Sequence, residues 1–200
     1  ITDSGTLAIT GATTIDAGSA DITLTEAAST FGSLSLTGAN VAVTESDATE
    51  LAASTVSGTF DIISGGAITN SGALAITGAS TFTNTAGTDA AITLANAGNA
   101  FTGTVGFSTD SGSAVTVVDT TALDLQALTA ASLSVTAGGD VTDSGTLAIT
   151  GATTIAAGSG NITLTEAAST FGALALTGAN VLVVENAAME LAASTISGTA

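Results

Sequence analysis

The 200-residue sequence contains no lysine, arginine, histidine, cysteine, proline, tryptophan or tyrosine. Without cysteine and histidine there is no thiolate nucleophile, no imidazole base, no zinc site of the usual kind and no disulfide framework. Serine and threonine are abundant, but a hydroxyl nucleophile needs an activating base, and neither histidine nor lysine is present. We therefore expect a protein that is not an enzyme, with no catalytic, cofactor-binding or dedicated metal-binding residue.

The charge is of one sign only. Seventeen acidic residues and no basic ones give a net charge of −17, so no side chain can neutralise the phosphates of a nucleic acid or of an anionic lipid surface. No apolar run reaches the roughly 18 residues of a membrane helix, so membrane insertion is not expected. Because 45% of the residues are hydrophobic and only 8% are charged, the sequence is that of a folded chain and not of an acidic disordered tail.

Internal repeats organise the sequence. Residues 1–60 align with residues 141–200 without a gap and are identical at 47 of 60 positions. A more divergent copy lies between them, because the same landmarks recur there at equal intervals along the chain. The landmarks are Ile22, Leu24 and Phe31, then Ile92, Leu94 and Phe101, then Ile162, Leu164 and Phe171. A repeat architecture is therefore the first structural prediction.

Within each copy, apolar residues alternate with small or polar ones, which is the pattern of half-buried strands. Each short strand ends at a cluster of glycine, asparagine, aspartate or serine, such as residues 37–40 and 64–66. Such strands are too short for a sandwich, and the Asn-Gly and Asp-Gly dipeptides of tight hairpins are absent. We predict an all-β chain that forms a right-handed parallel β-helix, or β-solenoid, with about three coils of ~20 to 25 residues per 70-residue repeat.

The whole chain, 1–200, is predicted to be one continuous solenoid. It divides into a partial repeat 1–21, repeats 22–91 and 92–161, and a partial repeat 162–200. The nine landmark residues are expected to point inward and to stack in ladders along the axis. Because the sequence begins at Ile1 without an initiator methionine and has no recognisable capping repeat, we expect it to be an internal piece of a longer protein.

Three stretches carry a resemblance to a known family. Residues 92–105 (ITLANAGNAFTGTV), residues 133–145 (LSVTAGGDVTDSG) and the Gly-Ala-Thr-Thr-Ile segments at 11–15 and 151–155 resemble the repeat core of bacterial filamentous haemagglutinin-like exoproteins. These very large proteins are exported by two-partner secretion or as autotransporter passengers. The resemblance implies a β-helix shaft that is secreted to the bacterial cell surface and used in adhesion or contact with other cells.

The corner sequence Asp3-Ser4-Gly5 returns as Asp143-Ser144-Gly145, and two such loops are able in principle to supply the carboxylate pair of an aspartic protease. The middle copy has Asn70-Ser71-Gly72 instead, and an Asp that is replaced by Asn within one chain indicates a turn position. We predict turn positions, not catalytic ones, at this set of residues: Asp3, Gly5, Asn70, Gly72, Asp143 and Gly145.

Other acidic residues recur in register between the outer copies, namely Glu26/Glu166, Glu45/Glu185 and Glu50/Glu190. They are expected to be solvated corner charges that keep the shaft soluble. Weak, non-specific Ca²⁺ binding by such acidic rows is the alternative, although no Ca²⁺-loop signature is present. Asn40, Asn70, Asn161 and Asn180 are predicted to form side-chain amide ladders at corners.

Three functions from different classes follow from these features. The prediction is a structural or adhesive shaft whose partners are the neighbouring repeats of the same chain, other cell surfaces or glycans, and further shafts through lateral self-association. A carbohydrate-processing β-helix enzyme would need basic and aromatic residues that this chain lacks. A binding array remains the alternative, either a self-assembling fibre or an ice- or carbohydrate-binding solenoid with ranks of threonine.

Overall fold

The computed structural model of the chain describes residues 1–86, 90–109 and 112–200. Within these residues every regular element is a strand, and the strands pair in parallel. The described part of the chain has no helix of the length and apolarity needed to cross a membrane. The predicted all-β parallel β-helix is confirmed.

In the described part of the chain the strands form two sheets. The 13-stranded sheet contains β1 (Ala8–Asp16), β3 (Thr30–Gly38), β5 (Thr49–Leu51), β6 (Ser54–Val56), β8 (Ile68–Asn70), β9 (Leu74–Ile76), β11 (Ile92–Leu94), β12 (Ala100–Phe101), β14 (Ala114–Asp119), β16 (Ser132–Ala137), β19 (Ala152–Ala156), β21 (Ala173–Gly178) and β23 (Thr195–Ile196). The 10-stranded sheet contains β2 (Ile22–Leu24), β4 (Val41–Glu45), β7 (Phe60–Ser64), β10 (Ser80–Asn84), β13 (Thr104–Ser108), β15 (Leu123–Ala130), β17 (Val141–Asp143), β18 (Leu147–Ile149), β20 (Ile162–Leu164) and β22 (Val181–Val183).

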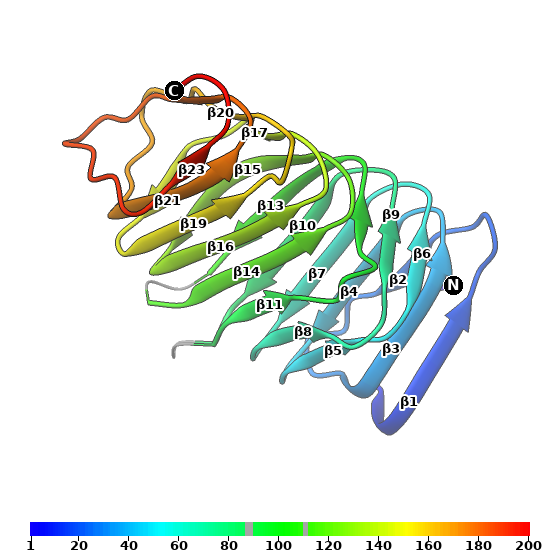
Figure 1. Cartoon of the computed structure of the whole chain (residues 1–200). Coiled ribbons are helices and arrows are strands. Elements are labelled where there is room, and N and C mark those ends of the chain that lie inside the picture. The colour runs from blue at the N-terminus through cyan, green and yellow to red at the C-terminus, as the bar shows by residue number, and fades with distance from the viewer. Residues whose placement is uncertain (87–89, 110–111) are drawn as a thin grey trace.

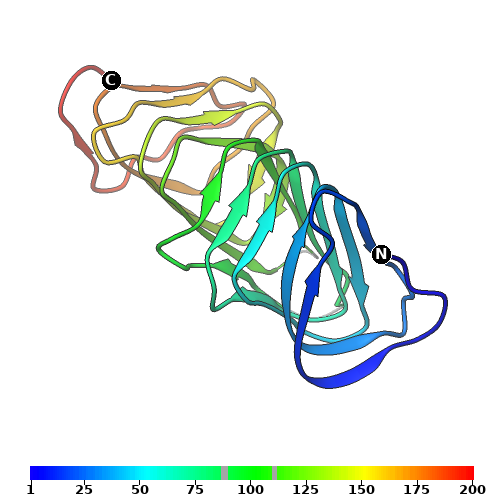
Figure 2. The same cartoon turned by 90° about the vertical axis from the view of Figure 1, so that its right-hand side faces the viewer.

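The chain winds around a single axis, and each coil adds strands to both sheets (Figure 1). Seen from its N-terminal side, its successive turns lie one behind another (Figure 2). Paired residues of neighbouring coils are between 17 and 25 positions apart, from Leu34 and Leu51 to Ser80 and Val105. Some coils are thus shorter than predicted, because a corner needs only one or two small residues.

The interior is a continuous apolar column. Alternate residues are buried in most strands, so that Ile22 and Leu24 face the core while Thr23 between them faces outward. Four aromatic rings pack in the middle of the column: Phe82 lies 5.8 Å from Phe60, 6.1 Å from Phe101 and 5.8 Å from Phe107, measured between ring centroids. This alternation is the reason why the chain forms strands and not helices.

The sequence repeat that separates Ile22, Ile92 and Ile162 does not correspond to a whole number of coils. From β2 to β20, which carry Ile22 and Ile162, the 10-stranded sheet advances by seven strand-to-strand steps. Ile92, halfway between them in sequence, lies in β11 of the 13-stranded sheet. One sequence repeat therefore advances the chain by about three and a half coils, and the middle copy presents its motif on the opposite sheet from the outer copies.

Candidate functional site

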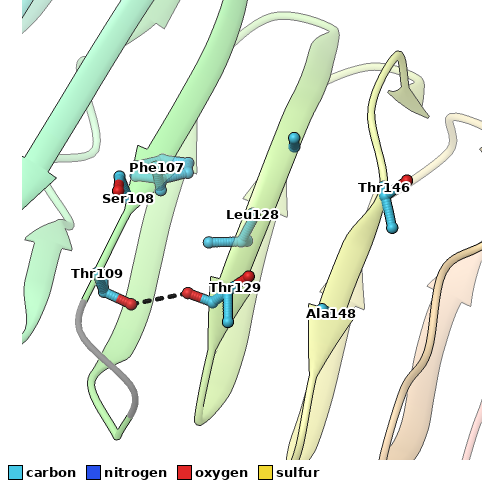
Figure 3. A pocket seen from close by; sticks show the side chains of 8 residues that line it. Phe107, Ser108, Thr109, Leu128, Thr129, Thr146 and Ala148 are labelled. Atoms are coloured by element: carbon cyan, nitrogen blue, oxygen red, sulfur yellow. Dashed lines mark hydrogen bonds between the residues drawn. The ribbon is translucent and has the colours of Figure 1, made fainter.

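A groove of about 670 Å³ opens on the 10-stranded sheet, where β13, β15 and β18 lie side by side (Figure 3). It is lined by Phe107, Ser108, Thr109, Ala127, Leu128, Thr129, Thr146 and Ala148. Thr109 Oγ1 donates a hydrogen bond of 2.7 Å to the carbonyl oxygen of Thr129. Phe107 and Leu128 are each only 3% exposed, so neither offers a face on which a ligand can stack. The lining combines four hydroxyl side chains with the methyl groups of two alanines and contains no charged side chain.

A rank of hydroxyls crosses the outer face of the 13-stranded sheet. Cross-strand pairing places Thr69, Thr93, Thr116, Ser134 and Thr154 side by side on five successive coils. Glu50 stands at one end of this rank, beside Thr69, and Ala175 stands at the other. The rank is one residue wide and about 20 Å long at the ~4.8 Å spacing of paired strands. It is a regular surface of neutral donors and acceptors.

Three of the residues predicted at turns hold the next coil in place, and two of them, Asn70 and Asp143, are the last residues of β8 and β17. Asp3 accepts hydrogen bonds from the backbone N–H groups of Thr25 and Glu26, both at 3.2 Å. Asp143 accepts the same two bonds from Thr165 and Glu166, at 2.7 and 3.2 Å. These backbone groups follow directly after β2 and β20, where the strand leaves the sheet, so the carboxylate satisfies donors that no longer have a ladder partner.

Asn70 does the same in the middle copy. Its Oδ1 accepts the backbone N–H of Asn96, which follows β11, at 3.3 Å. Its Nδ2 also donates to the carbonyl oxygen of Gly72 and to Asn99 Oδ1. Asn70 is therefore equivalent to Asp3 and Asp143, and the role needs an acceptor but no charge. The two aspartates themselves lie seven coils apart, or roughly 34 Å at the paired-strand spacing, so the structure does not bring them together as a catalytic pair.

The glycines of these corners differ in their surroundings. A Cβ atom on Gly72 would lie 1.9 Å from the backbone nitrogen of Ala53, and one on Gly145 would lie 2.2 Å from that of Ala127. Glycine is needed at both positions because the backbone of the preceding coil passes through the space of a side chain. Gly5 has no atom within 4 Å of the equivalent point.

Each landmark phenylalanine is paired with a carboxylate of the following coil. The backbone N–H of Phe31 donates to Glu45 Oε1 at 2.7 Å, that of Phe101 to Asp119 Oδ1 at 3.1 Å, and that of Phe171 to Glu185 Oε1 at 2.9 Å. Nothing in the sequence analysis anticipated this pairing. The signal for it was the equal spacing of phenylalanine and glutamate in the two outer copies.

Glu45 is 2% exposed, so its expected role as a solvated corner charge is wrong. Burial raises its pKa from 4.5 to about 7, against the lowering effect of the hydrogen bonds from Phe31 N–H and from Thr49 Oγ1. Burial also raises the pKa of Asp119, opposed by hydrogen bonds from Phe101 and Thr121. The two carboxylates lie in the interior because the backbone N–H groups of Phe31 and Phe101 would otherwise have no hydrogen-bond partner there.

A second contact recurs two residues before each phenylalanine. The side chains of Ser29, Asn99 and Ser169 accept the backbone N–H groups of Leu7, Leu74 and Leu147 of the preceding coil. All three acceptors are fully buried. Sequence reasoning missed them because a serine before a strand reads as an ordinary turn residue.

The predicted amide ladder is confirmed at one corner. Asn180 Nδ2 donates to Asn161 Oδ1 at 2.8 Å, and Asn180 Oδ1 accepts from the backbone and the hydroxyl of Thr199. Asn40 joins a similar ladder, in which it donates to Asp21 and accepts from Thr59. Hydrogen bonds from the backbone N–H of Asn40 and then from its side chain lower the pKa of Asp21.

The landmark residues all lie in the core. Six of them belong to β2, β11 and β20, and Phe31 and Phe101 belong to β3 and β12. Phe171 follows Thr170, which pairs with Ala148 of β18. The fully or almost fully buried set is Ile22, Leu24, Phe31, Ile92, Leu94, Phe101, Ile162, Leu164 and Phe171. In the described part of the chain, the acidic residues form no group of three or more that can hold a metal ion.

Residues 1–37, 38–108 and 112–177 match the model of a protein family described as repeats of unknown function, DUF5649. This match spans most of the sequence, and the chain belongs to that family. No curated protein and no solved structure matches the chain. The family therefore establishes a repeat protein, which agrees with the β-solenoid, and leaves its role to be inferred from the molecule.

Proposed function

We propose that this chain is a structural and adhesive shaft of a secreted protein at a bacterial cell surface, of the filamentous haemagglutinin-like kind, with no catalytic role. The observation that carries the proposal is the unbroken parallel pairing from Thr2 to Gly198, in which every coil is hydrogen-bonded to the next. Such a stack converts sequence length into axial length. About nine coils at the ~4.8 Å strand spacing give a rod of roughly 40 Å.

The contacts between coils support a mechanical role. The Asx corners, the Phe–carboxylate pairs and the buried acceptors Ser29, Asn99 and Ser169 each join one coil to an adjacent one. None of these contacts joins residues that are distant along the axis. The stability of such a stack comes from the interfaces between adjacent coils. Further repeats therefore lengthen the rod with the same kinds of contact. The outer faces are acidic or hydroxylated, which favours contact with neutral glycans over nucleic acid or anionic lipid.

The test is to delete or duplicate one 140-residue, seven-coil unit in the parent protein and to image the cell surface by electron cryotomography. We expect the reach of the surface filament to change by roughly 34 Å per unit. Adhesion between cells should fall with the shortened form while its export is unchanged. An unchanged reach, or full adhesion by a protein retained inside the cell, contradicts the proposal.

A carbohydrate- or ice-binding array is a second candidate, and the specific observation that favours it is the rank Thr69, Thr93, Thr116, Ser134 and Thr154. Replacement of Thr93, Thr116 and Thr154 by valine keeps the β-branched shape and removes the hydroxyls. If the rank binds, glycan-array signals or inhibition of ice recrystallisation should be lost in this variant and retained in one with Thr23 and Thr163 replaced by valine on the other sheet. Equal behaviour of the two variants rejects this candidate.

A further inference from the structure

The single glutamine of the chain, Gln126, contacts the preceding coil through its side chain. It belongs to β15, and its Nε2 donates a hydrogen bond of 2.6 Å to Oγ1 of Thr104 in β13. The two residues are 22 positions apart in the sequence, and both are half-buried. A carboxamide and a hydroxyl of adjacent coils are therefore held in direct contact at a place that is partly shielded from water.

A glycine makes room for this contact. The register between β13 and β15 shifts at Gly106, which has no side chain to fill the space above its backbone. A Cβ atom on Gly106 would lie 3.0 Å from Oε1 of Gln126. The amide of Gln126 thus lies over the bare backbone of the preceding coil, where a larger residue would crowd it.

A carboxylate with an unused acceptor lies beside this pair. Asp124 pairs with Thr104 in the ladder between β13 and β15 and precedes Gln126 by two positions, so the three side chains share the outward face of the sheet. Oδ1 of Asp124 is shielded from solvent and has no hydrogen-bond partner among the described residues. Because buried polar atoms are normally hydrogen-bonded, this oxygen is well placed to take a proton from a neighbouring group.

We propose that Thr104 and Gln126 form an ester cross-link between adjacent coils, with Asp124 as the base. Asp124 takes the hydroxyl proton of Thr104 while Oγ1 attacks Cδ of Gln126. The nitrogen of the tetrahedral intermediate then takes this proton from Asp124, the Cδ–Nε2 bond breaks, and ammonia leaves. One C–N bond is exchanged for one C–O bond, the carboxylate is regenerated, and neither an oxidant nor a reductant is consumed.

The distances suit this reaction. Cδ of Gln126 is one bond of about 1.33 Å from Nε2 and so lies within about 3.9 Å of the Thr104 oxygen. A small rotation of the glutamine side chain brings the two atoms to the ~3 to 3.5 Å at which reacting atoms meet. The reaction occurs once in each chain and turns over no substrate, so it is compatible with a protein that is not an enzyme.

The cross-link supplies a kind of covalent tie that the composition otherwise excludes. The chain has no cysteine for a disulfide and no lysine for an amide cross-link between side chains. An ester needs only a hydroxyl and a carboxamide. It closes the loop of chain between residues 104 and 126, so that unfolding or axial tension cannot fully separate β13 from β15.

Mass spectrometry of the intact chain tests the cross-link. Loss of one ammonia predicts a mass about 17 Da below that of the sequence. Thr104→Val removes the hydroxyl, Gln126→Asn shortens the amide side chain and Asp124→Asn removes the base, so each variant should have the full mass of its own sequence. Thr104→Ser keeps a hydroxyl and should keep the loss.

Thr142→Val is the matched control, because Thr142 pairs with Asp124 from the following coil and takes no part in the reaction. It should show the same loss of mass as the unmodified chain. Circular dichroism of each variant checks that the β-structure is intact.

Proteolysis locates the link. A protease that cuts before aspartate places Thr104 in the peptide 89–109 and Gln126 in the peptide 124–139. After digestion of the denatured chain the two peptides should remain joined. Hydroxylamine, which cleaves esters and spares amides, should release them from each other.

A chain with the full mass of its sequence, both when freshly purified and after prolonged incubation at neutral pH, overturns the proposal. A loss of ammonia that persists in Thr104→Val comes from another site, such as a cyclised asparagine, and overturns it as well. The shaft proposal does not depend on this result, because hydrogen-bonded coils form a rod with or without a covalent link between them.

Discussion

The middle copy and the outer copies make the same contacts on opposite sheets. In the outer copies the I-T-L strands β2 and β20 belong to the 10-stranded sheet, and in the middle copy β11 belongs to the 13-stranded sheet. Yet Asn70 accepts a hydrogen bond from the backbone of Asn96 as Asp3 does from Glu26. Asp119 likewise accepts one from Phe101 as Glu45 does from Phe31. The comparison teaches that the repeat is defined by its contacts with the adjacent coils and not by its place around the axis.

The two regions differ in how their cores are filled. The middle of the column contains the cluster of Phe60, Phe82, Phe101 and Phe107, in which edge-to-face and stacked rings pack around Phe82. Phe31 and Phe171 of the outer copies lie outside this cluster and are slightly more exposed. The middle copy should therefore be the more strongly packed part of the rod.

Replacement of core phenylalanines should produce the largest difference between the two regions. Phe82→Ala leaves a cavity at the centre of the ring cluster and should lower the free energy of unfolding by about 4 to 5 kcal/mol, against about 3 kcal/mol for Phe31→Ala. Urea unfolding followed by far-ultraviolet circular dichroism measures both. Equal losses, or a larger loss for Phe31→Ala, would remove the distinction between the regions.

The corner glycines should give the next largest effect. Gly72→Ala forces a Cβ atom against the backbone of Ala53 and should cost about 2 to 3 kcal/mol, as overpacking of a rigid site does. Gly5→Ala, its counterpart in the outer copy, should change the free energy of unfolding by less than about 0.5 kcal/mol. Urea titrations of the two variants compare them directly, and a tolerated Gly72→Ala would show that the coils are less closely packed than described.

The buried carboxylates should make stability depend on pH. Burial raises the pKa of Glu45 from 4.5 to about 7 in the folded chain. Its contribution to the free energy of unfolding is therefore fully present below pH 4.5 and is lost as the pH rises through 7. Glu45→Gln should remove this loss and be more stable than the unmodified chain above pH 7, by roughly 2 kcal/mol.

Melting temperatures measured between pH 4.5 and pH 8.5 test this prediction. Glu26→Gln, at an exposed position, is the matched control for the loss of one carboxylate, and the effect of Glu45→Gln is measured relative to it. Asp119→Asn should flatten the profile in the same direction, because burial also raises the pKa of Asp119. A profile that Glu45→Gln does not alter would contradict the interior placement of this carboxylate.

Exchange of the corner Asx residues should have the smallest effect. Asp143→Asn keeps one acceptor oxygen for Thr165 and loses the second, to Glu166, at a cost of about 1 kcal/mol. Asn70→Asp should cost somewhat more, because its Nδ2 donates to Gly72 and to Asn99. Chemical unfolding of both variants gives the order, and the reverse order would show that the amide of Asn70 contributes nothing.

Much of the fold could be predicted from the sequence because its rules are local. Alternation in segments such as Ile22–Leu24 indicates strands. The exchange of Asp3 for Asn70 indicates that this position needs a hydrogen-bond acceptor, which both residues supply. The nine landmark residues are buried for the same reason, since every second side chain of a short strand must face the column.

The placement of the middle copy on the opposite sheet could not be predicted. The motif makes the same contacts in either sheet, so its residues do not indicate on which side of the axis it lies. The burial of Glu45 was missed for a different reason. A carboxylate is read as a surface group, and only the unpaired N–H of Phe31 at the strand end brings it inside. Both errors concern how a coil meets its neighbours, which a linear pattern does not display.

The placement of the middle copy on the opposite sheet is tested most directly by pulsed electron–electron double resonance, which measures distances between spin labels. The chain has no cysteine, so spin labels can be placed in pairs at the outward-facing Thr23, Thr93 and Thr163 through cysteine substitutions. We predict that the distance from 23 to 163 reflects seven coils, roughly 34 Å, and is well below twice the distance from 23 to 93, since the middle label lies on the opposite sheet. A distance from 23 to 163 equal to twice that from 23 to 93 would place all three labels on one line and contradict the account.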